Sequence, residues 1–350
     1  MSQRELTILP VISISPSKIC TYSEVHWTPE KPRRGATFVN LDPNQPLHPK
    51  FINSVRTANG KISNIARKKI STALDYLLLM SSEKTVKIHK LNKTVKFRIC
   101  FITLTLPAKQ IHSDNEIKEK LLNSFLIELT RFHQVKNYIW RAEKQKNGNI
   151  HFHVIIDKFI LYNELRARWN RICNKLGYVD TYQYNMKQFF SSGFKMSTSK
   201  SDNRTRAQQI KAYQIGIKSD FRSPNSTDIH KVKYITNVKA YVSKYMTKDP
   251  QFESSASPEE IQKLLCKGRI WACNQELSDI KNAREYIDNE IQNALQETVK
   301  KSECKTFSSD YYNVYYISIN QLKVLSPDVL FLYFARYMSE HFKFSIQLVT

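Results

Sequence analysis

Several residue types and patterns that mark common protein classes are scarce or absent in this sequence. Only 7 of the 350 residues are glycine, so glycine-rich phosphate-binding loops are rare, and no GxxxxGK[ST] segment occurs. The six cysteines form no CxxC pair, which argues against a zinc ribbon or a thioredoxin-like redox site and favours reduced thiols. No apolar run reaches about 18 residues, and no export signal is visible at the start. We therefore expect a soluble, cytoplasmic protein with no membrane partner.

Negative charge is also in short supply. Lysine and arginine number 54 against 31 aspartate and glutamate residues, which gives a formal net charge of +23. The excess lies between residues 51 and 250, while the last hundred residues are slightly acidic. A basic body of this kind is expected of a protein that neutralises nucleic-acid phosphates. A generally basic, solvated surface or attachment to an anionic membrane would produce the same composition.

Composition and periodicity divide the chain into four expected parts. Prolines and turn residues dominate the beginning, and apolar residues at helical spacing then appear. The parts are an extended N-terminal arm (1–50), a basic helical segment (51–94), a core (95–250) with a polar insertion (191–230), and a helical and aromatic C-terminal extension (251–350). We expect the insertion to be a long loop.

The order of elements in the core indicates its fold. β-Branched and aromatic residues predict a strand over 95–107, and an amphipathic helix follows with Ser113 as N-cap and Glu116 at the capping-box position. The next predicted elements are two strands (136–143 and 149–157), a helix closed by Gly177 (161–177) and a strand (178–186). This order predicts an α+β fold in which an antiparallel central sheet carries helices on one face, as in ferredoxin-like domains. Later segments predict two helices (234–248 and 274–301) and an aromatic strand (310–320).

Two histidines head the apolar run "HFHVIID" at residues 151–157. In a strand, residues i and i+2 point to the same side, so His151 and His153 project together while Phe152 faces the core. Two imidazoles on one face can converge on one ion. Because a histidine, any residue and a second histidine arise easily by chance, the alternative is an ordinary half-buried strand.

The turn before this strand decides whether a carboxylate joins the histidines. If the loop contains three residues, with Gly148 in the left-handed conformation, Gln145 pairs with Asn149 and Glu143 lies opposite His151. A two-residue loop would instead turn Glu143 to the other face, because a one-residue slip reverses every side chain. Two imidazoles and one carboxylate would suit a divalent ion such as Mn²⁺ or Mg²⁺. Otherwise Glu143 is a surface charge.

A second motif, "YVSKYMTK" at 241–248, contains two tyrosines and two lysines. On a helix, Tyr241, Lys244, Tyr245 and Lys248 occupy an arc of roughly 100°. A neighbouring ammonium favours the phenolate, and tyrosine attack on a phosphodiester would give a phosphotyrosine. The alternative is a surface helix with partly buried rings and snorkelling lysines.

Three segments in this order resemble the HUH endonuclease superfamily of rolling-circle replication initiators. They are "FITLTLP" (101–107), "HFHVIID" (151–157) and "YVSKYMTK" (241–248), and the last looks most like the paired-tyrosine motif of microviruses and related single-stranded DNA phages. "GRIWACNQEL" (268–277) also resembles a segment of small phage initiators. Glu143 lies where eukaryotic-virus relatives often place a third metal ligand.

The resemblance implies a function and assigns roles. His151 and His153 would bind Mg²⁺ or Mn²⁺, Tyr241 and Tyr245 would be nucleophiles, and Lys244 and Lys248 would contact phosphate or assist the phenols. The protein would nick and rejoin single-stranded or stem-loop origin DNA in a bacterial cytoplasm, leaving a 3′ hydroxyl for a host polymerase, with a host helicase as partner. A transposase or a conjugative relaxase is the first alternative. A non-catalytic single-stranded nucleic-acid-binding protein is the second.

Overall fold

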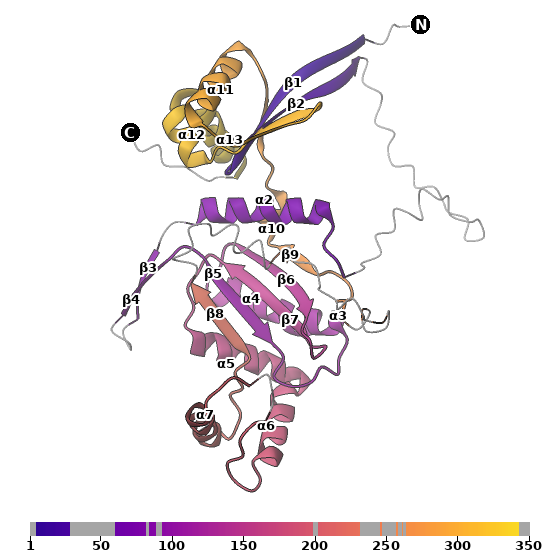
Figure 1. The fold of residues 1–350 in the computed structure, drawn as a ribbon, viewed down its shortest axis with the longest axis vertical. Coiled ribbons are helices and arrows are strands. Elements are labelled where there is room, and N and C mark those ends of the chain that lie inside the picture. Colours follow the sequence, from indigo (N-terminus) through magenta and orange to yellow (C-terminus); the bar gives the residue numbers. More distant parts are fainter. Residues whose placement is uncertain are drawn as a thin grey trace, which may run out of the picture. The chain divides into compact units, whose positions relative to one another are not determined.

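A computed structural model describes residues 5–28, 60–81, 84–88, 93–198, 202–231, 246, 257, 261 and 264–342. The chain divides into two compact units (Figure 1). One unit joins the two ends of the chain, Met1–Thr57 and Ser278–Thr350, and the other is Ala58–Leu277. Each unit is described by itself.

The second unit is built on a five-stranded sheet in which all neighbouring strands are antiparallel. The strand order is β8-β5-β7-β6-β9, so β7 with its two histidines lies in the centre. The strands are β5 (Cys100–Thr105), β6 (Tyr138–Lys144), β7 (Ile150–Ile156), β8 (Thr227–Lys231) and β9 (Trp271–Cys273). The predicted α+β fold with an antiparallel central sheet is therefore confirmed.

Two helices cover the face of this sheet that lies opposite the histidines. The first begins as α3 (Asp114–Ile117), passes through a π-helical turn (Lys118–Leu122) and continues as α4 (Asn123–Phe132). Ser113 caps it as predicted, by accepting a hydrogen bond from Glu116 N, but the Glu116 carboxylate pairs with Lys120. The second helix is α5 (Tyr162–Cys173), and Gly177 ends the turn after it with φ of 74°. Trp169 of α5 packs edge-on against Phe125 and Phe152, which anchors both helices to β7.

The start of this unit follows the predicted helix more closely than the predicted strand. α2 (Asn64–Met80) begins at the cap Ser63 and buries its apolar side. The predicted strand over 95–107 is two strands, because β4 (Lys93–Phe97) pairs with β3 (Lys84–Ile88) in a separate hairpin. Arg98 marks the break, where its Nε donates to Ser81 O at 2.7 Å.

Two predictions after residue 177 are wrong. The expected strand over 178–186 is the helix α6 (Tyr178–Phe189), whose half-buried or buried Tyr178, Tyr182 and Met186 are four residues apart and therefore share a helical face. The expected loop over 191–230 contains the helix α7 (Arg206–Lys218) and most of β8, which becomes an edge strand beside β5. The expected helix over 234–248 lies outside the described residues, apart from the buried, helical Met246.

The first unit contains a sheet made from both ends of the chain. The order is β10-β1-β2-β12-β11, so the segment expected to be an extended arm supplies a long hairpin. Its strands are β1 (Glu5–Ser15), β2 (Lys18–Thr28), β10 (Ala283–Tyr286), β11 (Thr306–Ser308) and β12 (Tyr312–Tyr315). The expected helix over 274–301 is divided into α10 (Gln275–Asp279), β10 and α11 (Asn289–Ser302). The helices α12 (Ile319–Leu325) and α13 (Leu332–Phe342) follow.

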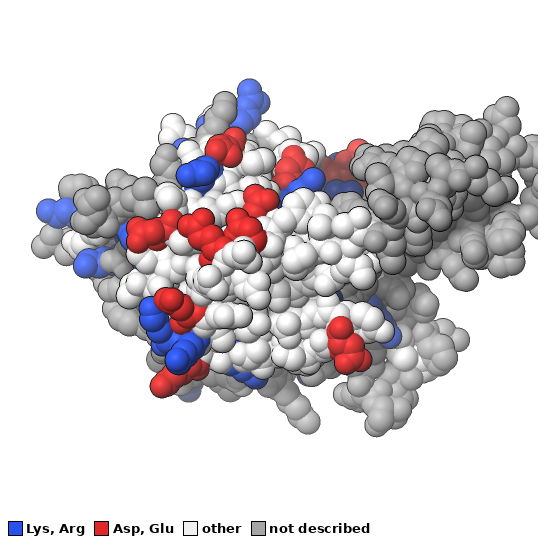
Figure 2. All heavy atoms as spheres, turned by 90° about the horizontal axis from the view of Figure 1, so that it is seen from above, with Lys and Arg blue, Asp and Glu red and all other residues white. Residues whose placement is uncertain are grey.

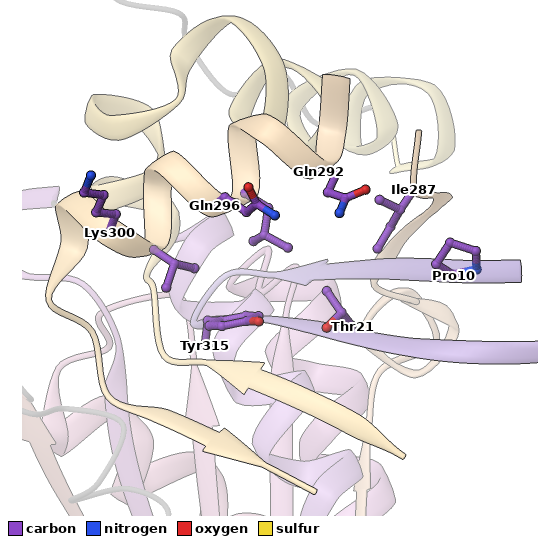
Figure 3. Close-up of a pocket in the computed structure, with 9 residues that line it drawn as sticks. Pro10, Thr21, Ile287, Gln292, Gln296, Lys300 and Tyr315 are labelled. Atoms are coloured by element: carbon purple, nitrogen blue, oxygen red, sulfur yellow. The ribbon is translucent and has the colours of Figure 1, made fainter. Parts of the chain in front are cut away.

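A cavity of about 600 Å³ lies between α11 and the sheet of this unit (Figure 3). Gln292 and Gln296 line it from the helix, and Pro10, Thr21 and Tyr315 line it from the strands. No acid or histidine is among its described lining residues, so it offers no set of metal ligands. Among the described residues, no helix combines the length and apolar character needed to cross a bilayer.

Candidate metal centre

The turn between β6 and β7 sets the register of the candidate site. Gln145 N donates to Asn149 O at 2.9 Å, and Gly148 N donates to Gln145 O at 2.8 Å, so the loop contains three residues. Gly148 has φ of 83°, the left-handed conformation that glycine adopts at little cost. As the three-residue alternative predicted, Glu143 lies directly opposite His151.

Glu143, His151 and His153 converge at this point. Their potential ligand atoms all lie within 4.8 Å of one another. The Nε2 of His153 is 2.9 Å from Oε1 of Glu143, and the two imidazole rings stand nearly perpendicular with centroids 4.7 Å apart. Both histidines are buried, whereas the Glu143 side chain is 32% exposed. The arrangement offers three protein ligands with one side open to solvent, as a catalytic metal site requires.

The electrostatics favour the protonation states that bind metals. Burial, followed by the neighbouring His153 and against the attraction of Glu143, lowers the pKa of His151 to about 4. Burial alone would raise the pKa of Glu143, but its hydrogen bond to His153 and the charges of His153, Arg141 and His151 lower it below the ordinary value. The site thus holds a neutral imidazole and an ionised carboxylate at neutral pH, as metal binding requires.

An unsatisfied atom supports the same interpretation. Nδ1 of His151 is buried and has no hydrogen-bond partner. Buried polar nitrogens normally have a partner, so this atom fits a group that expects a ligand. The donor set of the three residues therefore fits a divalent cation.

Sequence reasoning missed Arg141, a buried residue on the same face. It is only 2% exposed and pairs in register with His153, two residues before Glu143. Its positive charge contributes to the low pKa of Glu143. The alternation of β6 was the signal available, since residues 141 and 143 must share a face.

A buried polar cluster, also missed, holds the ends of both strands. Lys144 Nζ lies 2.6 Å from Asp114 Oδ1 and 3.2 Å from Gln110 Oε1, which also accepts from Ile150 N at 2.6 Å. Asn149 Oδ1 accepts from Gln110 N at 2.8 Å. Because Lys144 and Ile150 adjoin Glu143 and His151, the cluster fixes the backbone on which those ligands stand.

The predicted nucleophiles cannot be located in the same way. Tyr241, Lys244, Tyr245 and Lys248 lie outside the described residues. Their approach to the histidines stays a prediction.

The fold and the site define an α+β domain with a candidate two-histidine, one-carboxylate metal centre. Residues 99–250 of this domain match the family model described as replication-associated protein ORF2. The match spans all three segments that carried the resemblance and confirms it as a resemblance to replication initiators. No curated protein matches the chain significantly.

One solved structure with detectable similarity is the N-terminal nuclease domain of non-structural protein 1 of minute virus of mice. It is 11% identical, and the match covers 48% of this chain and 74% of that chain with a TM-score of 0.18. That domain is described with Zn²⁺ coordinated in its active-site pocket. A TM-score this low does not support an argument about this chain.

Proposed function

We propose that this protein initiates rolling-circle replication by nicking and rejoining single-stranded origin DNA. The observation that carries the proposal is the convergence of His151, His153 and Glu143 within 4.8 Å inside a segment that matches a replication-associated family. Its basic charge suits a phosphate-rich substrate.

The three residues would hold a divalent ion, Mg²⁺ or Mn²⁺. When bound, the ion would supply positive charge that polarises a phosphate oxygen. Two imidazoles and one carboxylate also suit Zn²⁺, so a metal titration must include it.

Tyr241 or Tyr245 would supply the nucleophile. Its phenolic oxygen attacks the phosphorus atom, a tyrosine–phosphate bond forms, and the bond to the 3′ oxygen breaks. The phenol loses its proton, and the departing 3′ oxygen gains one and becomes the primer hydroxyl. Lys244 and Lys248 would favour the phenolate. The second tyrosine would cut the regenerated origin, and the stored phosphotyrosine would then be resealed.

The direct test is a covalent adduct on labelled single-stranded DNA in the presence of Mn²⁺. We expect the adduct to vanish in the Tyr241→Phe, Tyr245→Phe double variant and to persist at a reduced level in each single variant. His151→Asn should abolish it through the metal. An adduct that survives the double change would exclude these tyrosines. DNA binding with no adduct in the wild type would favour the non-catalytic alternative.

A transposase or relaxase would use the same groups on different DNA ends. The paired tyrosines favour an initiator, since two nucleophiles permit successive cuts without release of the strand. A bacterial host with its own helicase and polymerase, and a phage as source, complete the proposal.

A further inference from the structure

We propose that the exposed face of α7 binds duplex DNA beside the cleavage site. This inference rests on the proposed function, because it assumes that the substrate is origin DNA. Lys211, Gln214 and Lys218 are three and four residues apart, so they form one stripe along the helix, and all three are exposed. α7 contains no acidic residue. We call these three side chains the α7 stripe.

Positive charge is unevenly distributed over the described surface. Seen from above, acidic side chains group near the centre, with basic ones scattered around them (Figure 2). The acids near α7 already have cationic partners outside the stripe. Asp202 pairs with Arg204 at 2.6 Å, and Asp220 pairs with Lys187 at 2.7 Å. The charge of Lys211 and Lys218 is thus left available to phosphates.

The chemistry of the α7 stripe fits a duplex better than a single strand. Non-specific single-strand surfaces rely on exposed aromatic rings that stack on bases. The one aromatic residue of α7, Tyr213, turns inward, with its ring 4.7 Å from Phe190 and 5.6 Å from Phe194. A helix fits the major groove, where an amide reads base edges and lysines contact phosphates. Gln214 lies between the two lysines as such a helix requires.

α7 is also held rigidly. Thr205 and Gln208 form a capping box at its beginning. At Gly216 a Cβ atom would lie 2.3 Å from the ring of Phe221, so only glycine permits this close packing. Phe221 in turn stacks on Phe190 with centroids 5.7 Å apart. A rigid helix keeps its stripe in place without an ordering cost on binding.

The polypeptide after α7 returns to the sheet at the level of the candidate metal centre. Thr105 of β5 donates from its N to Ser226 O at 2.8 Å, and the same Thr105 pairs in register with His151 on its other side. Adjacent strands are about 4.8 Å apart, so Ser226 and His151 are about 10 Å apart along the sheet. Asn170 of α5 secures this return through bonds to Pro224 O and Ser226 Oγ. Figure 1 shows α6 and α7 beyond this end of the sheet. A duplex on the α7 stripe could therefore lead its single-stranded extension to the histidines.

The test compares the full-length protein with the Lys211→Gln, Lys218→Gln variant. Fluorescence anisotropy measures binding to a 20-base-pair duplex and to a single strand of about the same length, in EDTA so that no cleavage occurs. We expect duplex affinity to fall about 10-fold at about 0.15 M salt, and the slope of log K against log salt to flatten by about 2. Single-strand affinity should change less than about twofold.

The matched control is Lys300→Gln, Lys301→Gln on α11, which removes the same charge from the other unit and should leave duplex binding unchanged. An equal loss of duplex and single-strand binding in the α7 variant would overturn the inference in favour of a single-strand surface. So would unchanged duplex binding, or a control that loses as much as the α7 variant. Because the assay needs no nicking, its result is independent of whether the tyrosine chemistry fails.

Discussion

Acidification of the metal-free protein tests the buried state of His151. This residue is 8% exposed, and burial is the main reason that its pKa falls from 6.5 to about 4. The folded protein therefore keeps the imidazole neutral at pH values at which the unfolded chain protonates it. A depressed histidine pKa contributes stability that is intact above the unfolded value of about 6.5 and is lost as the pH falls towards the folded value.

The size of this effect follows from the two pKa values. One pKa unit corresponds to about 1.4 kcal/mol, so protonation of the unfolded state costs about 2 kcal/mol of stability at pH 5 and about 3 kcal/mol at pH 4. The His151→Asn variant has no group to titrate at this position. Urea unfolding in EDTA at pH 7, 5 and 4, followed by tryptophan fluorescence, measures the free energy of unfolding of both proteins. Between pH 7 and pH 4 the wild type should lose about 3 kcal/mol more than the variant.

A matched control removes a different imidazole. His341 is exposed on α13, and His341→Asn should retain the full acid sensitivity of the wild type. If the wild type and His151→Asn lose the same stability on acidification, the imidazole is not held neutral by burial. That result would refute the electrostatic account of the site.

Three further substitutions test the site and its support. Glu143→Gln keeps the shape of the side chain but removes its charge, so Mn²⁺ affinity measured by calorimetry should fall roughly 10- to 100-fold, and unchanged affinity would remove Glu143 from the ligand set. Asp114→Asn breaks the buried pair with Lys144 and should lower the free energy of unfolding by roughly 3 kcal/mol in urea; a change below about 0.5 kcal/mol would show that the pair contributes little. Gly148→Ala meets no atom within 4 Å but must keep φ at 83°, so backbone strain alone should cost about 1 kcal/mol, visible as a lower Tm, and an unchanged Tm would contradict the strain.

The sequence by itself determined the local geometry of the candidate site. A glycine at position 148 fits the left-handed position of a three-residue loop, and strand alternation then places Glu143, His151 and His153 on one face. The Ser113 cap and the Gly177 stop were also readable, because capping depends on a few neighbouring residues. These features need only short-range information.

Tertiary structure decided the features that depend on distant partners. Whether Tyr178 and its neighbours alternate as a strand or repeat as a helix is ambiguous in a short segment, and packing against the rest of the chain selected α6. Strand β8 enters the sheet only because β5 offers it an open edge, and the ends of the chain share a sheet through pairings between residues at opposite ends of the sequence. The burial that lowers the pKa of His151 arises in the same way, because a local pattern does not record which distant residues exclude water from a side chain.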